Sequence, residues 1–203
     1  MCMIKVAENT AAANEQHYEV PTEFFECHLG PLNKYSSCEW KNASNIKEAE
    51  EHTFESYIEK MNLVELEDKS LQNMIPGDTN RKRMKLLEIG CGWGSFLLYA
   101  SAKFPSLDFV GFSNSATQIR HIQEEAVRKG LKNLKALKLD INDFCNLEKR
   151  SQIQDFQNDS KFQRIISIEC LEHRCVSTYY KLCFSQLSKK CKFFSMLSNL
   201  IYS

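Results

Sequence analysis

The spacing of apolar residues changes part-way along the chain, at the Ile-Pro-Gly-Asp turn signal of residues 75–78. Before this turn, apolar residues recur at helical intervals, which predicts helices over residues 21–29 and 44–66. Ser44 is a residue type that accepts a hydrogen bond at a helix start, so we expect it to be the N-cap of the second helix.

After the turn, short apolar runs alternate with longer amphipathic segments, which is typical of strands that alternate with helices. Strands in this arrangement pair in parallel through right-handed crossovers. The sequence therefore predicts an α/β fold with a doubly wound, mostly parallel sheet. The predicted strands cover residues 85–89, 107–112, 134–139, 164–168 and 192–197, and the predicted helices cover residues 95–103, 115–129 and 171–187.

This division predicts three regions along the chain. They are a loose N-terminus (1–16), a helical cap (17–78) and an α/β ligand-binding domain (79–203). A polar stretch, residues 146–161, separates the third and fourth predicted strands. Its composition predicts an exposed, mobile loop.

The overall charge narrows the classes of partner. The 26 basic and 26 acidic residues give a formal net charge of zero. No electrostatic argument therefore favours nucleic acid or an anionic membrane surface. The basic run between Arg81 and Lys85 is interpreted as a solvated linker.

The nine cysteines form no C-x-x-C pair and no Cys/His cluster at zinc spacing, so no metal site is expected. Dispersed cysteines, and a polar N-terminus without the apolar run of a signal peptide, are typical of a cytoplasmic protein. The longest apolar stretch, residues 193–202, is interrupted by polar residues and is about half as long as a membrane-spanning helix. We therefore expect no transmembrane segment.

The most informative motif is Glu88-Ile-Gly-Cys-Gly-Trp-Gly94, which follows a predicted strand and opens a predicted helix. In a doubly wound sheet, ligands bind beyond the carboxyl ends of the strands, where such turns lie. Gly90 and Gly92 allow a tight turn and the close approach of a ligand. The N–H groups that begin the next helix attract a phosphate or a carboxylate. A turn with a structural role only is the alternative.

Two details of this motif discriminate between ligands. Dinucleotide-binding turns follow G-x-G-x-x-G, whereas the glycines here follow G-x-G-x-G. Glu88 lies two residues before the first glycine, where a carboxylate repels a phosphate and accepts a hydrogen bond from an ammonium group. S-adenosylmethionine carries an ammonium, a carboxylate and a sulfonium. It therefore fits better than NAD, the cofactor of an oxidoreductase on the same fold.

The chain carries, in order, the motifs His17-Tyr-Glu-Val-Pro-Thr-Glu-Phe-Phe25, Lys34-Tyr-Ser-Ser-Cys-Glu-Trp40, Leu86-Leu-Glu-Ile-Gly-Cys-Gly-Trp-Gly-Ser95, Gly111-Phe-Ser-Asn-Ser-Ala-Thr-Gln118 and Ser167-Ile-Glu-Cys-Leu-Glu-His173. Together they resemble the cyclopropane fatty acid synthase and coclaurine N-methyltransferase superfamily. The resemblance covers about residues 17–187. It implies a Rossmann-like class I methyltransferase fold with N-terminal helices, and S-adenosyl-L-methionine as the cofactor.

The resemblance also implies a set of cofactor contacts. Tyr35 and Ser36 would reach over the methionine end of the cofactor, and the glycine turn would lie under it. Ser113 and Asn114 stand where dinucleotide-binding folds usually have an acid, which makes Ser113 and Gln118 the expected ribose and adenine contacts. The expected cofactor-binding residues are Tyr35, Ser36, Glu88, Gly90, Gly92, Gly94, Ser113, Asn114, Gln118 and, flanking the adenine, Asp140 and Ile141.

The catalytic candidates are Glu169, Glu172 and His173, which follow the fourth predicted strand. Glu169 and Glu172 would share one face of a helix at their spacing of three. A protonated amine must lose its proton before it attacks a methyl group, and a carboxylate or an imidazole accepts that proton. In the alternative interpretation, Glu172 caps a helix and His173 packs in the core.

The cyclopropane synthases and the N-methyltransferases of this superfamily both use the sulfonium methyl group of the cofactor. Residues outside the cofactor motifs therefore decide which substrate accepts it. Glu169 stands where cyclopropane synthases usually have a glycine or another uncharged residue, and an extra acid suits a cationic amine. The resemblance therefore favours N-methylation of a small amine. Methyl or methylene transfer to a phospholipid is the alternative.

Members of the family usually continue well beyond 203 residues with helices that cover the substrate, and Ser188-Lys-Lys-Cys191 replaces a usual Pro-Gly turn. We therefore expect a sheet that is incomplete at its C-terminal edge, near residues 192–197. An open edge favours pairing with another chain, so a homo-oligomer is expected there. A truncated, non-catalytic isoform is the alternative to an active enzyme.

Overall fold

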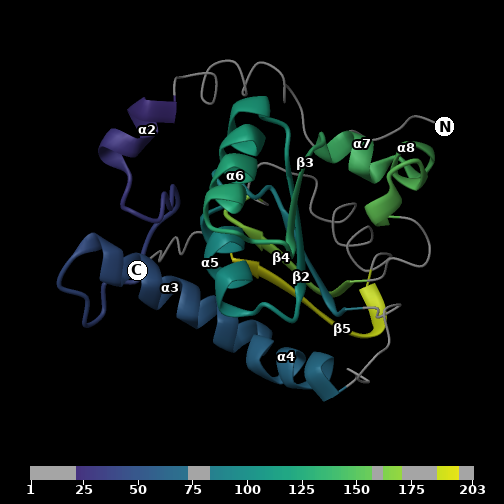
Figure 1. Ribbon diagram of the computed structural model, residues 1–203, viewed down its shortest axis with the longest axis horizontal. Coiled ribbons are helices and arrows are strands. Elements are labelled where there is room, and N and C mark those ends of the chain that lie inside the picture. Colours follow the sequence, from purple (N-terminus) through teal and green to yellow (C-terminus); the bar gives the residue numbers. More distant parts are fainter. Residues whose placement is uncertain (1–21, 73–82, 157–161, 171–186, 197–203) are drawn as a thin grey trace, which may run out of the picture.

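The computed structural model describes residues 22–72, 83–156, 162–170 and 187–196. Its centre is a five-stranded sheet in the order β3-β2-β1-β4-β5, and all four strand pairs are parallel (Figure 1). The predicted doubly wound α/β fold is therefore confirmed. The strands are β1 (Lys85–Ile89), β2 (Asp108–Ser113), β3 (Leu134–Lys138), β4 (Phe162–Ile168) and β5 (Leu187–Met196).

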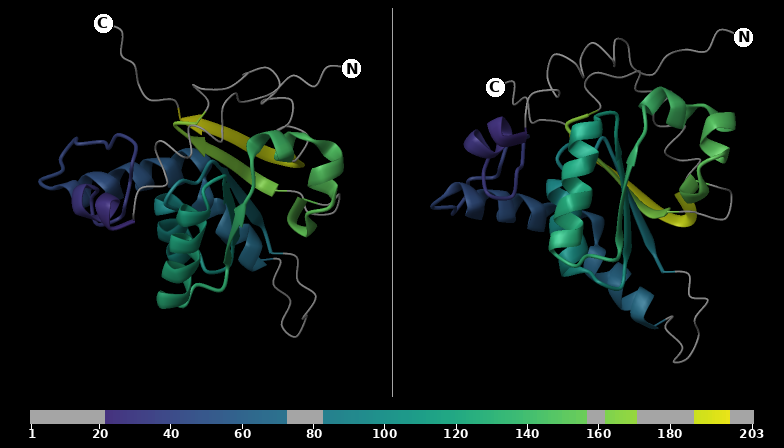
Figure 2. Two further views of the ribbon diagram at one scale, coloured as in Figure 1. Left: turned by 90° about the horizontal axis from the view of Figure 1, so that it is seen from above. Right: turned by 45° about the horizontal axis from the view of Figure 1, so that its top comes forward.

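Helices cover both faces of this sheet, as the two views of Figure 2 show. One face carries the longer helices and the other carries two short helices and a 3-10 turn. The first face holds α3 (Ile46–Met61), α4 (Leu63–Gln72), α5 (Ser95–Lys103) and α6 (Ala116–Arg128), with α2 (Thr22–His28) at their edge; the second holds α7 (Ile141–Cys145), α8 (Leu147–Ser151) and η1 (Gln154–Phe156).

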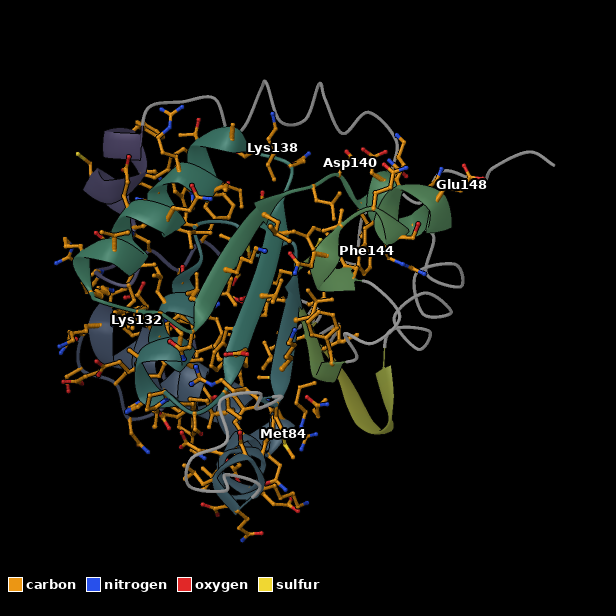
Figure 3. All side chains as sticks on the ribbon, turned by 45° about the vertical axis from the view of Figure 1, so that its right-hand side comes forward. Met84, Lys132, Lys138, Asp140, Phe144 and Glu148 are labelled. Carbon is orange, nitrogen blue, oxygen red and sulfur yellow. The ribbon has the colours of Figure 1, made fainter. Side chains whose placement is uncertain are left out.

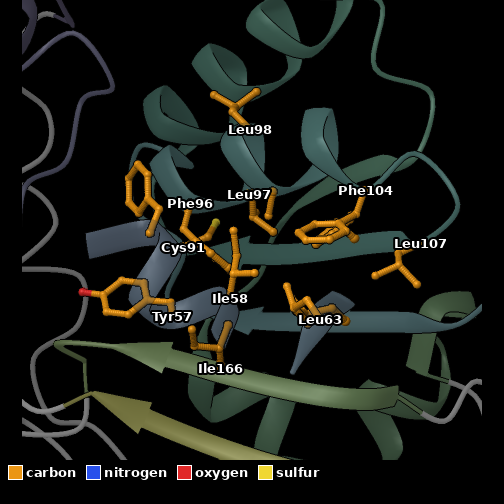
Figure 4. Close-up of a cluster of buried hydrophobic side chains, with 14 of the residues drawn as sticks. Tyr57, Ile58, Leu63, Cys91, Phe96, Leu97, Leu98, Phe104, Leu107 and Ile166 are labelled. Carbon is orange, nitrogen blue, oxygen red and sulfur yellow. The ribbon is translucent and has the colours of Figure 1, made fainter. Parts of the chain in front are cut away.

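Alternation along the strands divides the core into two clusters. In β1, Leu86 packs with the side chains of α3 and α5, whereas Leu87 packs with Phe144 and the other apolar residues of the opposite face. Successive side chains of a strand point to opposite faces, which accounts for this division. Figure 4 shows the first cluster, in which residues of α3 and α5 meet over the sheet. By the same alternation, Glu88 lies on the face of Leu86.

The predicted helix over residues 44–66 is in fact two helices, and Ser44 is not its N-cap. Asn45 caps α3 by accepting a hydrogen bond from the Glu48 N–H at 3.0 Å. Asn62 ends α3 with a left-handed φ of 53° and donates its N–H to the Glu59 carbonyl at 2.9 Å. Asparagine tolerates this conformation better than most residues, so the chain bends here and starts α4.

The prediction of an exposed loop over residues 146–161 is wrong for the part that the structure describes. Leu147–Ser151 forms α8, and Asn146 caps it by accepting from the Glu148 N–H at 2.9 Å. Phe156 is buried, with its ring centroid 5.0 Å from that of Phe144. Phe156 therefore anchors this segment on the sheet, together with Ile153, which packs against the same cluster.

Some predictions lie outside the described residues, namely the loose N-terminus and most of the helix over residues 171–187. β5 starts earlier than predicted, at Leu187, and stands at the edge of the described sheet, next to β4 alone. None of the helices that the structure describes combines the length and the apolar character needed to cross a membrane.

Candidate functional site

The glycine turn joins β1 to α5, as predicted, and its backbone has a conformation that glycine adopts readily. Gly90, Gly92 and Gly94 have φ angles of 72°, 51° and 73°. The N–H groups of Gly90 and Cys91 donate to the Phe112 carbonyl at 3.1 and 3.0 Å, which fixes the turn against the end of β2. Left-handed φ angles at three positions explain why the turn needs its glycines.

The surroundings of the three glycines differ. A Cβ atom on Gly94 would lie 2.5 Å from Ile122 of α6, and one on Gly90 would lie 2.6 Å from the Cys170 sulfur. A Cβ atom on Gly92 would meet no protein atom within 4 Å. Gly94 therefore permits helices α5 and α6 to pack closely, while Gly92 faces open space that a ligand can enter.

Glu88, at the end of β1, is a buried acid. Only 3% of its surface is exposed, and its Oε2 atom has no hydrogen-bond partner. Burial raises the pKa of the Glu88 carboxyl to about 8, and the charge of Lys34 opposes this rise. An unpartnered carboxylate oxygen at this depth is costly, and a cationic ligand group would satisfy it.

Lys34 is a buried base near this acid, and the sequence analysis did not single it out. It is 6% exposed, donates from Nζ to the Ser36 hydroxyl, and lies 5.6 Å from the centroid of the Tyr57 ring. Burial lowers the pKa of the Lys34 ammonium, while the charges of nearby acids, including Glu169 and Glu88, oppose this effect. Lys34 is the first residue of the motif Lys34-Tyr-Ser-Ser-Cys-Glu-Trp40 and directly precedes Tyr35, which is the signal that could have identified it.

Helix α3 holds the segment that carries Lys34, Tyr35 and Ser36. Glu50 is fully buried and accepts from the N–H groups of Leu32 at 3.1 Å and Lys34 at 3.0 Å. Thr53, one turn on, accepts from the Glu39 N–H at 2.7 Å. Glu50 was also missed from the sequence, although an acid four residues before Phe54 on the apolar face of a helix is a visible anomaly.

Tyr35 and Ser36 lie in this held segment. Tyr35 is 60% exposed, and its ring centroid is 6.2 Å from that of Phe25. Phe25 also packs on Trp93 of the glycine turn at 4.8 Å. Trp93 is 3% exposed, yet its indole Nε1 has no hydrogen-bond partner. The N-terminal region and the glycine turn therefore meet through aromatic contacts, and each of Glu88 and Trp93 has one unpartnered polar atom there.

The residues predicted at the end of β2 come together. The Ser113 hydroxyl donates to Gln118 Oε1 at 2.7 Å and accepts from the Ser115 N–H at 3.2 Å. Ser113 and Gln118 are buried, and Asn114 between them is half-buried. The amide of Gln118 carries two donors besides its oxygen, which suit ribose or adenine acceptors.

Asp140 and Ile141 lie just after β3. Asp140 caps α7 by accepting from the Asn142 N–H at 2.7 Å, and Ile141 is buried in the second core cluster. Figure 3 shows Asp140 at the end of the sheet opposite Met84, which precedes β1. Both residues therefore lie at the carboxyl end of the strands, where the other expected ligand contacts lie.

Glu169, directly after β4, has a left-handed φ of 45°. Its Oε1 atom accepts a hydrogen bond from the Ser37 hydroxyl at 2.9 Å. The predicted acid therefore lies beside the segment of Tyr35 and Ser36. The other two catalytic candidates, Glu172 and His173, lie outside the described residues.

Comparison with known proteins identifies sequences similar to this chain. Residues 6–197 match the family described as mycolic acid cyclopropane synthetase. A probable (S)-tetrahydroprotoberberine N-methyltransferase 2 from Papaver bracteatum is 30% identical over 163 residues, which are 80% of this chain and 37% of the relative. A cyclopropane-fatty-acyl-phospholipid synthase from Escherichia coli K12 is 27% identical over 160 residues, which are 78% of this chain and 32% of the relative. The chain thus spans less than two-fifths of the length of these relatives.

Two solved structures share the fold. A coclaurine N-methyltransferase bound to N-methylheliamine and SAH has a TM-score of 0.72 at 24% identity, over 95% of this chain and 48% of the other. A mycolic acid cyclopropane synthase complexed with SAH and CTAB has a TM-score of 0.58 at 22% identity, over 88% of this chain and 53% of the other.

Proposed function

The chain belongs to the mycolic acid cyclopropane synthetase family, and we propose that it binds S-adenosylmethionine and transfers its methyl group to a small amine. Family membership supports the cofactor, because the relatives include N-methyltransferases and the two structural neighbours hold SAH. Since the chain covers 37% of the first of these relatives, its activity and its substrate are both part of the proposal.

The glycine turn fits this cofactor. The ammonium group of the ligand suits the unpartnered Oε2 atom of Glu88. Gly92 offers the open approach that a bulky ligand requires. When bound, the cofactor supplies an electrophilic methyl group on a sulfonium.

One observation carries the choice of an amine as acceptor. Glu169 occupies a left-handed conformation, which costs a residue with a side chain roughly 1–2 kcal/mol relative to the right-handed one. Glycine avoids this cost, yet the chain has an acid there. Strain of this kind at a ligand-binding edge supports a functional role for the side chain.

A carboxylate at this position performs two tasks in amine methylation. It attracts the protonated amine, and it accepts the proton that the nitrogen must lose before its lone pair attacks the methyl carbon. The carbon–nitrogen bond forms as the carbon–sulfur bond breaks, which leaves a neutral thioether. We include Glu172 and His173 in this proposal as the further proton acceptors.

Lipid methyl or methylene transfer is the second candidate. The family description and the 27% identity to the phospholipid synthase favour it. The acceptor in that reaction is an alkene, which has no proton to lose and no positive charge. The Glu169 carboxylate would then have no positive charge to attract and no substrate proton to accept, and for this reason we prefer the amine.

The test starts with calorimetric titration of the purified chain with S-adenosylhomocysteine, with Gly92→Asp as the control. Micromolar affinity that the control loses supports the cofactor site. Methyl transfer from labelled S-adenosylmethionine is then measured with a panel of amines and with phospholipid vesicles. Label in amines alone supports the proposal, and label in lipid alone overturns it. A folded chain that does not bind the cofactor product is a non-catalytic isoform.

A further inference from the structure

Two side chains of opposite charge are buried together at the glycine turn. Glu88 is 3% exposed and Lys34 is 6% exposed. Charged groups are rarely withdrawn this far from water unless each has a partner of opposite charge. The segment of Lys34 lies against the end of the glycine turn, because the Ser95 hydroxyl at the start of α5 donates to the carbonyl of Asn33, the residue before Lys34. The charge of Lys34 also acts on Glu88. Nevertheless, the Glu88 Oε2 atom has no hydrogen-bond partner, and the Lys34 ammonium donates to the neutral hydroxyl of Ser36.

The other acids that act on Lys34 are already engaged. Glu50 accepts two backbone N–H groups, and Glu169 accepts the Ser37 hydroxyl. Among these three acids, Glu88 is the one with a buried side-chain oxygen that has no hydrogen-bond partner. The buried site therefore holds one acid and one base that can each form a further hydrogen bond with a ligand.

The base is also fixed in position. Its backbone N–H is bound by Glu50 at 3.0 Å, and its ammonium lies over the Tyr57 ring. A charged group that is held by its own backbone and by an aromatic face loses little freedom when a ligand binds. Lys34 is thus preorganised rather than a flexible surface lysine.

We propose that Lys34 and Glu88 form a receptor for a zwitterion, in which Glu88 binds the ammonium and Lys34 binds the carboxylate of an amino-acid end. This inference rests on the proposed function, because S-adenosylmethionine and its product carry such an end. It adds that Lys34 makes the site specific for the α-carboxylate. The contact also gives the buried Lys34 ammonium an anionic partner. A hydrogen bond between two charged groups is stronger than one between neutral groups, so this contact should contribute strongly to affinity.

The test compares ligands as well as variants. S-adenosylhomocysteine has the full zwitterion, its decarboxylated analogue keeps the ammonium only, and 5′-methylthioadenosine has neither group. Calorimetry on the wild-type chain should give an affinity for S-adenosylhomocysteine about ten- to hundredfold above that for the decarboxylated analogue, as a charge-assisted contact predicts. Lys34→Met should remove this difference, and Lys34→Arg should restore most of it.

Lys47→Met is the matched control, because the Lys47 side chain is 60% exposed on α3. It should leave all three affinities unchanged. Binding of 5′-methylthioadenosine should be equal in wild type and Lys34→Met, which a merely structural role for Lys34 would not allow.

Each remaining outcome decides the question. Equal affinities of the wild-type chain for S-adenosylhomocysteine and its decarboxylated analogue overturn the inference. This comparison needs no variant, so it tests the inference even if Lys34→Met does not fold. A uniform loss of all three ligands in Lys34→Met also overturns it, while the proposed function stands. A folded wild-type chain that binds none of the ligands overturns both.

Discussion

Ser37 donates a hydrogen bond of 2.9 Å to Glu169, a residue 132 positions later in the chain. The bond joins the N-terminal region to the end of β4, so the candidate site is built from both regions. Glu50 of α3 holds the same segment by binding the Lys34 N–H, and Phe25 of α2 packs on Trp93 of the glycine turn. The N-terminal helices are therefore part of the site.

Gly92 and Gly94 should respond differently to the same substitution. Alanine at either position adopts a left-handed φ, which costs about 1–2 kcal/mol of stability. Gly94→Ala should cost a further 1–3 kcal/mol or so, because its Cβ atom overlaps Ile122. Gly92→Ala should instead weaken S-adenosylhomocysteine binding by roughly tenfold or more, since its Cβ atom enters the open side of the turn. Thermal unfolding and calorimetry measure the two effects, and equal stability losses would contradict this assignment.

Glu88 should make the stability of the chain depend on pH. Its pKa is about 8 in the folded chain against 4.5 for the free group, so the folded state holds the proton more tightly. The stability that this provides is complete below pH 4.5 and is lost as the pH rises through 8. Relative to Glu88→Gln, the wild type should lose about 1 kcal/mol per pH unit between pH 5.5 and 8.

Chemical denaturation of both chains across this range measures the difference. The variant lacks the titrating group but keeps the size of the side chain, so groups that do not interact with Glu88 largely cancel. A constant difference across the range would show that Glu88 has an ordinary pKa. The variant should also bind S-adenosylhomocysteine more weakly at pH 8, because it offers no charge to the ammonium group.

Glu50→Ala should release the segment that carries Lys34. The substitution removes the acceptor of two backbone N–H groups, the part-buried one of Leu32 and the buried one of Lys34, and should lower the free energy of unfolding by about 2–4 kcal/mol. Urea unfolding gives this value. Glu51→Ala is the matched control on the next position of α3, where a partly exposed ion pair with Lys47 contributes less than about 1 kcal/mol. Similar losses in both variants would be evidence against the anchoring role of Glu50.

The sequence predicted those features that follow from local pattern. The order of strands and helices along the chain and the glycine turn were expected, because spacing and residue type determine them locally. Lys34 and Glu50 were missed for a physical reason. Their importance comes from burial by contacts between distant segments, which no local pattern records. The break at Asn62 was missed because the apolar residues continue at helical spacing across it.

Phe156→Ala tests the folding of the segment that was wrongly expected to be a loop. Phe156 is 4% exposed, and its ring lies 5.9 Å from that of Phe162. Removal of a buried phenyl ring should cost about 3–5 kcal/mol. Gln152→Ala, on the exposed surface of the same segment, should change stability by less than about 0.5 kcal/mol. Urea unfolding compares the two, and a small effect of Phe156→Ala would mean that the segment packs only loosely.

Glu169 combines backbone strain with the chemical role that we propose for it, and three variants separate the two. Glu169→Gly removes both the left-handed strain and the bond to Ser37, whereas Ser37→Ala removes the bond alone. Glu169→Gly should therefore be more stable than Ser37→Ala by about 1 kcal/mol in urea unfolding. Glu169→Gln keeps the shape and the acceptor oxygen but loses the charge. It should slow methyl transfer to amines by about 10²-fold or more, as loss of a general base predicts.

These effects should leave the cofactor site intact, because Glu169 contacts the substrate side of the site in this proposal. Affinity for S-adenosylhomocysteine should stay within about twofold of wild type in Glu169→Gln. If the slow step is proton removal, the rate of wild type should rise with pH while that of Glu169→Gln should stay low until the free amine loses its proton in solution. Wild-type rates in Glu169→Gln would exclude the carboxylate as proton acceptor, and the strain at this position would then need another explanation.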